Sequence, residues 1–219
     1  ARGALTGADY IITTIRAGGD AGRLFDEKTC LAHGVLGQET TGAGGFAMAI
    51  RSVPTLVYYC TLAREVSNPG HLIFNFTNPS GIITQALRSC GFANVYGICD
   101  APSGFIKQLE EILNVPYGAL DIECYGLNHL SWFRNAKLDG RDVQEELLNN
   151  PRTYHHSEMR LFTREMARLS GECMLNEYLY FFYRREKSLS LVQYAEHPRG
   201  EMIYLINREL ETQLAQMEL

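Results

Sequence analysis

Short, β-branched apolar runs alternate with longer helical segments along the first half of the chain. The apolar runs cover residues 10–15, 72–77 and 94–99 and are typical of buried strands. Helical spacing of apolar residues occurs at 47–66, 82–89 and 104–113. Strands and helices in alternation predict an α/β fold with a parallel sheet. In such sheets ligands gather at the carboxyl ends of the strands.

The pattern changes beyond about residue 116. Residues 120–124 and 131–138 are predicted strands, helices are predicted at 158–169 and 201–219, and residues 178–183 form a Tyr/Phe-rich stretch. We therefore expect two domains, residues 1–115 and 116–219.

Composition narrows the class of protein. The formal net charge is −5 and no basic block occurs, so a nucleic-acid partner is not expected. No apolar run reaches the roughly 18 residues of a membrane span, and no signal peptide is recognised, so no membrane partner is expected. The six cysteines lie far apart, which favours reduced thiols and a cytoplasmic location.

Two segments thirty residues apart carry the clearest chemical signal. Cys99 is followed by the acid Asp100, and His129 lies in a turn-like segment rich in Gly and Asn. Cysteine sulfur and histidine nitrogen suit a divalent transition metal, and two protein ligands leave positions open for substrate. An isolated Cys/His pair is more often structural, so spacing alone leaves both interpretations open.

Five motifs together identify a resemblance to a known family. They are residues 8–28 (with Arg16-Ala17-Gly18-Gly19 and Asp26-Glu27-Lys28), residues 37–45 (Gly-Gln-Glu-Thr-Thr-Gly-Ala-Gly-Gly), Thr77-Asn78-Pro79-Ser80-Gly81, Cys99-Asp100-Ala101-Pro102 and Gly126-Leu127-Asn128-His129. In this order they resemble glycoside hydrolase family four, the NAD-dependent 6-phospho-glucosidases. The resemblance runs from residue 1 to at least residue 205.

The resemblance implies a fold and a reaction. Residues 1–115 would be the second half of a Rossmann-like NAD-binding domain. Residues 116–219 would be an α+β substrate and metal domain like the C-terminal region of lactate and malate dehydrogenases. The implied substrate is a phosphorylated disaccharide or glucoside. Its cleavage uses NAD at sugar C3, a base at C2, elimination of the glycosidic oxygen, and a divalent metal, usually Mn²⁺.

The resemblance also implies residue roles. Cys99 and His129 match the metal ligands, and Asp100 matches the general acid of the enzymes that cleave α-linked substrates. Tyr178 matches the base, with Tyr180 as the alternative, and a nearby cation would lower the pKa of such a tyrosine. Cys124 could also reach a metal but is expected in the core.

Further residues match binding positions. Arg16, Asn78, Glu39 and Arg199 match substrate-binding residues, with Arg199 near the phosphate. Ile15, Arg16 and Asn78 match the nicotinamide side of the cofactor site.

The chain departs from the family pattern at its start. No Gly-rich turn follows the first strand, so we expect a central segment of a longer enzyme, with uncertain activity and weak NAD binding. The exposed edge of an incomplete sheet has to be covered by other protein, which favours a homo-oligomer, either a dimer or a tetramer. Two alternatives stay open: a 2-hydroxy-acid dehydrogenase, in which Cys99 has no role, and an inactive truncated remnant.

Overall fold

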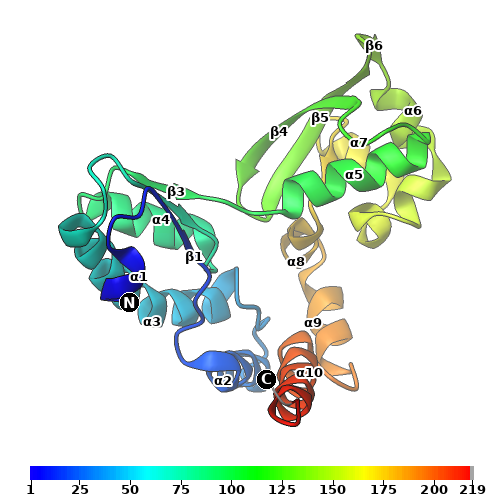
Figure 1. The fold of residues 1–219 in the computed structure, drawn as a ribbon. Coiled ribbons are helices and arrows are strands. Elements are labelled where there is room, and N and C mark those ends of the chain that lie inside the picture. The colour runs from blue at the N-terminus through cyan, green and yellow to red at the C-terminus, as the bar shows by residue number, and fades with distance from the viewer. Residues whose placement is uncertain (218–219) are drawn as a thin grey trace. The chain divides into compact units, whose positions relative to one another are not determined.

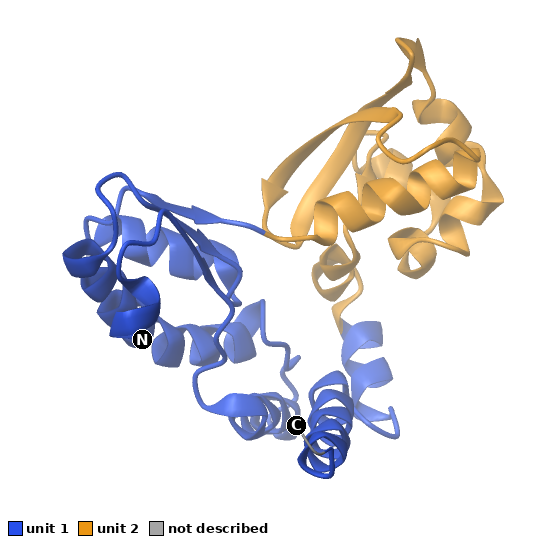
Figure 2. Cartoon of the chain, viewed as in Figure 1, with its two compact units in different colours: residues 1–98, 186–219 blue, residues 99–185 orange. Residues whose placement is uncertain are grey.

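Two separate sheets organise the protein. The computed structural model describes residues 1–217 and holds one parallel and one antiparallel sheet, each with helices, which confirms the predicted α/β class (Figure 1). The chain forms two compact units, residues 1–98 with residue 186 onward, and residues 99–185 (Figure 2). Each unit is described by itself.

The first unit is built on a three-stranded parallel sheet in the order β1-β2-β3. The central strand pairs with both neighbours, Tyr10 lying opposite Leu72 and Ile73 opposite Val95. Buried side chains from α3 and α4 pack on this sheet around Ile73 and Val95. The elements of this unit are α1 (Arg2–Leu5), β1 (Tyr10–Thr13), α2 (Gly19–Ala32), α3 (Gly42–Val66), β2 (Leu72–Asn75), α4 (Ser80–Ser89), β3 (Val95–Gly97) and α10 (Arg199–Ala215).

Two helices of this unit differ from the sequence prediction. The sequence predicts a loop over residues 16–20, whereas α2 begins at Gly19. Helix α3 begins at Gly42, earlier than predicted, and includes the Gly-rich motif. Its glycines allow close approach to the preceding loop, because a Cβ on Gly44 would lie 2.7 Å from the Gln38 carbonyl oxygen.

Helix α3 is relevant to the expectation that no segment of the chain is long and apolar enough to span a membrane. By length and composition alone this 25-residue helix could do so, contrary to that expectation. In the structure its residues Leu56, Cys60 and Ala63 are buried in the hydrophobic cluster of the first unit. We therefore interpret α3 as a core helix.

Helix α10 packs against α2 (Figure 1). Lys28 Nζ donates to Glu201 Oε1 at 2.6 Å, and the Gly200 N–H donates to Glu27 Oε2 at 2.8 Å. Residues 173 positions apart in the sequence thus meet within the first unit.

The second unit places an antiparallel sheet against helix α5. Phe105 of α5 meets Phe133 of β5 edge to face, with ring centroids 4.9 Å apart. The order is β4-β5-β6, and β7 pairs with β5. The elements are α5 (Ala101–Leu113), β4 (Leu120–Leu127), β5 (Leu130–Leu138), β6 (Arg141–Asp142), α6 (Gln144–Asn149), η1 (Pro151–Tyr154), η2 (Glu158–Leu161), α7 (Arg164–Leu169), β7 (Met174–Leu175), η3 (Glu177–Leu179) and α8 (Tyr180–Tyr183); α9 (Arg185–Gln193) leads back to the first unit.

The division between units differs from the boundary expected near residue 115. Helix α5 buries Phe105, Leu109 and Ile112 in the core of the second unit, so that unit begins at Cys99. The helix predicted over 158–169 is two shorter helices, η2 and α7, because Phe162 between them is extended and Thr163 caps α7. The sequence signal of α5 placed it after a strand but carried no information on which sheet it packs against.

Candidate active site

The turn between β4 and β5 positions His129. Leu127 pairs with Leu130, so Asn128 and His129 form the two-residue connection. His129 adopts φ +60°, a left-handed conformation uncommon outside glycine. The turn is held tightly, because Gly126, at φ +125°, leaves no room for a Cβ beside the Leu130 carbonyl.

This turn brings His129 to Cys99, as the sequence motifs predict. Cys99 Sγ lies 3.3 Å from His129 Nε2, and both residues belong to the second unit. Burial alone would raise the pKa of the Cys99 thiol. Hydrogen bonds from His129, the Ala101 amide and Asn128 outweigh it, so this pKa lies below its ordinary value.

The pKa of His129 is shifted in the opposite direction. Burial lowers the pKa of His129, but the hydrogen bond and charge of Cys99 raise it above the ordinary value, helped by Glu177 and Glu158. These opposite shifts favour a thiolate beside a cationic group. The same electrostatics would stabilise a bound dication.

The pair fits a transition metal in donor type and spacing. Bond lengths of about 2.3 Å to sulfur and 2.0 Å to nitrogen, at a tetrahedral angle, hold the two atoms about 3.5 Å apart. Among residues 1–217 no group of three or more His, Cys, Asp or Glu side chains could hold a metal. Cys99 and His129 would then be two ligands contributed by this chain, which leave positions for substrate oxygens.

Tyr178 lies against the same histidine. Its ring stacks on the His129 ring with centroids 4.7 Å apart and an angle of 21° between planes. The alternative base, Tyr180, is 3% exposed and packs edge to face on Phe162 in the core. The structure thus places Tyr178, rather than Tyr180, beside the candidate metal ligand.

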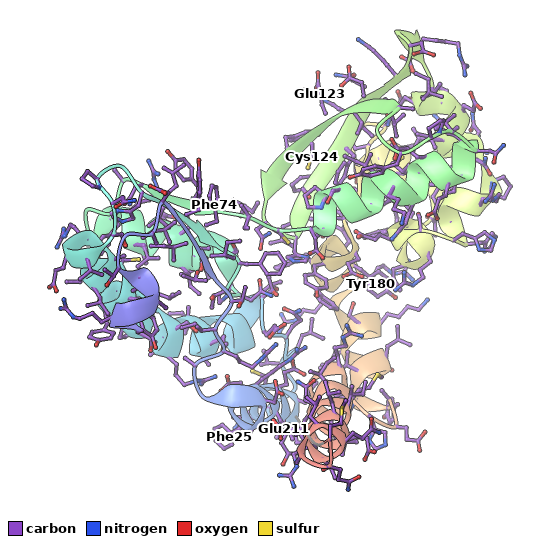
Figure 3. The ribbon with its side chains drawn as sticks, viewed as in Figure 1. Phe25, Phe74, Glu123, Cys124, Tyr180 and Glu211 are labelled. Carbon is purple, nitrogen blue, oxygen red and sulfur yellow. The ribbon has the colours of Figure 1, made fainter. Side chains whose placement is uncertain are left out.

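Asp100 and Cys124 have different surroundings. Asp100 is exposed at the start of α5, with its Oδ1 3.9 Å from Cys99 Sγ. Cys124 lies on β4 opposite Phe133 rather than in the core (Figure 3). The residue is exposed overall, although burial of the thiol raises its pKa, so its sulfur is a poorer ligand than that of Cys99.

A second group of predicted residues lines a pocket in the first unit. Ile15, Arg16, Glu39 and Asn78 all line one cavity of about 310 Å³, together with Phe76 and others. Arg16 and Asn78 follow the parallel strands β1 and β2, which explains why they meet at one edge of the sheet. Their roles in binding stay predictions.

A buried charge network behind this pocket was missed from the sequence. Glu39 is ion-paired to Arg16 and to Arg23, and Arg23 Nε donates to Glu27 Oε1 at 2.8 Å. Arg199 does not line the pocket, but its neighbour Gly200 donates to Glu27. The four-residue spacing of Arg23 and Glu27 would have indicated this ion pair if a helix had been predicted over residues 19–32.

The fold and the Cys99–His129 pair define a two-unit α/β protein with a candidate transition-metal site. The family model for family 4 glycosyl hydrolases matches residues 1–115, and the model for the C-terminal domain of that family matches residues 124–219. The chain belongs to glycosyl hydrolase family 4.

Individual relatives carry related activities. The chain is 40% identical over 149 residues to the 6-phospho-beta-glucosidase BglT of Thermotoga maritima, which covers 68% of this chain and 35% of that protein. It is 35% identical over 147 residues to the 6-phospho-alpha-glucosidase 1 of Lacticaseibacillus paracasei, covering 66% of this chain and 33% of the relative. The chain spans about a third of the length of these two curated relatives.

Solved structures agree with this assignment. The 6-phospho-beta-glucosidase of Thermotoga maritima, solved with manganese, NAD⁺ and glucose-6-phosphate, superimposes with a TM-score of 0.84 and 33% identity, over 95% of this chain and 49% of that one. A 6-phospho-alpha-glucosidase from gut microorganisms, in complex with NAD and Mn²⁺, gives 0.82 and 25% identity, over 93% and 50%.

Proposed function

We propose that this chain carries the metal and catalytic residues of an NAD- and divalent-metal-dependent 6-phospho-glucosidase. The observation that carries the proposal is the grouping of Cys99, His129 and Tyr178 in the second unit, where a soft donor pair lies beside a tyrosine. Relatives of the same family solved with NAD and Mn²⁺ support it. A 2-hydroxy-acid dehydrogenase would leave Cys99 without a role and does not fit the family match.

The bound dication would supply Lewis acidity toward sugar oxygens, and NAD⁺ a reversible hydride acceptor. Tyr178 would take the proton from sugar C2, and Asp100 would donate one to the glycosidic oxygen. The stacked His129 ring fixes one face of Tyr178, so the phenol has a defined orientation. Asp100 at this position favours α-linked substrates, although relatives of both anomeric types occur.

The pocket of the first unit would hold the sugar and nicotinamide. Its size suits a sugar or the nicotinamide end of a cofactor rather than a whole dinucleotide. Ile15, Arg16 and Asn78 would contact the nicotinamide side, and Glu39 would accept sugar hydroxyls from a position fixed by its two arginines. Arg199 would bind the substrate phosphate.

Other expectations belong to the same proposal. Residues 1–115 would serve the cofactor and residues 116–219 the substrate and metal, within a homo-oligomer, a dimer or tetramer. Six free cysteines and a net charge of −5 support a cytoplasmic location without a nucleic-acid partner.

Calorimetric titration of the chain with Mn²⁺ tests the metal site. Cys99→Ser and His129→Ala should each weaken binding at least about tenfold, since each removes one of two protein ligands. Cys124→Ser is the matched control, a cysteine of the same unit expected to leave the affinity unchanged. Parent-like binding in either ligand variant would refute the metal assignment.

The activity is tested on 6-phospho-glucosides of both anomers with NAD⁺ and Mn²⁺. Tyr178→Phe should abolish cleavage and solvent deuterium exchange at C2 while Mn²⁺ binding persists, because only the proton acceptor is removed. A parent chain that binds Mn²⁺ but neither cleaves nor exchanges at saturating NAD⁺ would favour the inactive-remnant alternative.

A further inference from the structure

A buried carboxylate lies close to the candidate active site without a cationic partner. Glu158 begins η2 and is 9% exposed. Its Oε2 accepts hydrogen bonds from the Asn176 side-chain amide at 2.9 Å and from the Glu177 N–H at 3.2 Å. Both donors are neutral, and no lysine or arginine among residues 1–217 forms an ion pair with it.

The donors to Glu158 belong to the segment that carries Tyr178. Asn176 is completely buried, and its N–H donates to the Ser131 carbonyl of β5 at 3.0 Å. Its Oδ1 accepts from the Tyr178 N–H at 3.5 Å. Ser131 follows His129 by two residues. Strand β5 therefore begins at the residue after His129 and holds the Tyr178 segment through Asn176.

We propose that Glu158 and Asn176 are a positioning pair that holds the Tyr178 ring against His129. The proposal does not depend on the proposed function, because it concerns the contact between two rings already seen in the structure.

A second carboxylate of the same unit provides a matched control. Glu110 is 1% exposed, and its Oε1 accepts from the backbone N–H groups of Gly118 at 2.8 Å and Leu120 at 3.0 Å. Both donors lie in or beside the connection between α5 and β4, outside the segment that carries Tyr178. Glu110→Gln therefore changes a buried carboxyl group with two backbone partners but should leave the ring pair unchanged.

The proposal is tested by proton NMR of the metal-free chain. The stacked tyrosine displaces the His129 Cε1 proton upfield, a resonance identified by its loss in His129→Gln. Tyr178→Ala defines zero displacement, and Tyr178→Phe should retain it. Asn176→Ala should lose more than half of the displacement, whereas Glu110→Gln should lose none. Should Asn176→Ala fail to fold, Asn176→Ser, which removes the amide donor to Glu158, carries the same comparison.

Glu158 is tested in the same way. Glu158→Gln keeps an oxygen that can accept both hydrogen bonds and should retain the displacement, whereas Glu158→Ala should lose more than half of it. An unchanged His129 resonance in Asn176→Ala or in Glu158→Ala would overturn the proposal.

Discussion

Replacing Gly200 by alanine should destabilise the protein through a single contact between α10 and α2. A Cβ on Gly200 would lie 2.7 Å from the Glu27 side-chain Cδ and closer still to Oε2. Glu27 cannot move aside easily, because it is 3% exposed and is bonded to Arg23 as well as to the Gly200 N–H.

The magnitude follows from three contributions. Forcing a methyl group into this contact costs about 1–3 kcal/mol. Losing a hydrogen bond to the buried carboxylate costs roughly 1.5–3 kcal/mol. Alanine is better than glycine in a helix by about 1 kcal/mol, which offsets part of this. The net expectation is about 3 kcal/mol lower stability.

Urea unfolding followed by circular dichroism measures the change, and the matched control is Gly104→Ala. Gly104 lies inside α5, where a Cβ would have no heavy atom from outside its own stretch of helix within 4 Å. This control should stabilise the protein by roughly 0.5–1 kcal/mol, because only the helix propensity changes.

A double-mutant cycle isolates the cause. In a Glu27→Ala background the obstructing carboxylate is absent, so Gly200→Ala should cost nothing further and the two changes should be strongly non-additive. If Gly200→Ala has the same urea unfolding midpoint as the parent, the reasoning is refuted. Additive effects of the two substitutions in the cycle would refute it as well.

Two further predictions concern ionisable groups of the second unit and the core. Burial and the charge of Glu177 raise the pKa of Glu158 to about 7, so the folded chain holds a proton that the unfolded chain releases above about 4.5. The contribution of this proton to the free energy of unfolding is about 3 kcal/mol; it is fully present below the unfolded pKa and is lost as the pH rises toward 7. Glu158→Gln should remove this pH dependence of the free energy of unfolding, measured from about pH 4 to 8. An unchanged pH dependence would contradict the prediction. The pKa of Cys99 is lowered, so its alkylation by iodoacetamide should reach half the maximal rate below pH 9, as followed by peptide mass spectrometry. The buried Cys60, with a pKa of about 11, should stay unmodified. Equal labelling of the two cysteines would count against the thiolate assignment.

Local signals in the sequence were sufficient to predict the strands of the parallel sheet in the first unit. The β-branched runs became β1, β2 and β3, and Arg16 and Asn78 follow the ends of β1 and β2 that line one pocket. Alternating strands and helices specify a parallel sheet, and parallel strands bring their carboxyl ends to one edge. The motif with His129 also predicted a turn, because Gly and Asn tolerate left-handed conformations.

Only the tertiary structure decided which distant residues meet. The contact of Glu27 with Gly200 joins positions 173 apart, and no periodicity within α2 or α10 encodes it. Likewise Glu158 meets Asn176, two residues before Tyr178, only because β7 pairs with β5 and η2 packs against β7. Helical and strand periods report which face of an element is apolar, whereas the partner of that face depends on how separate segments pack together.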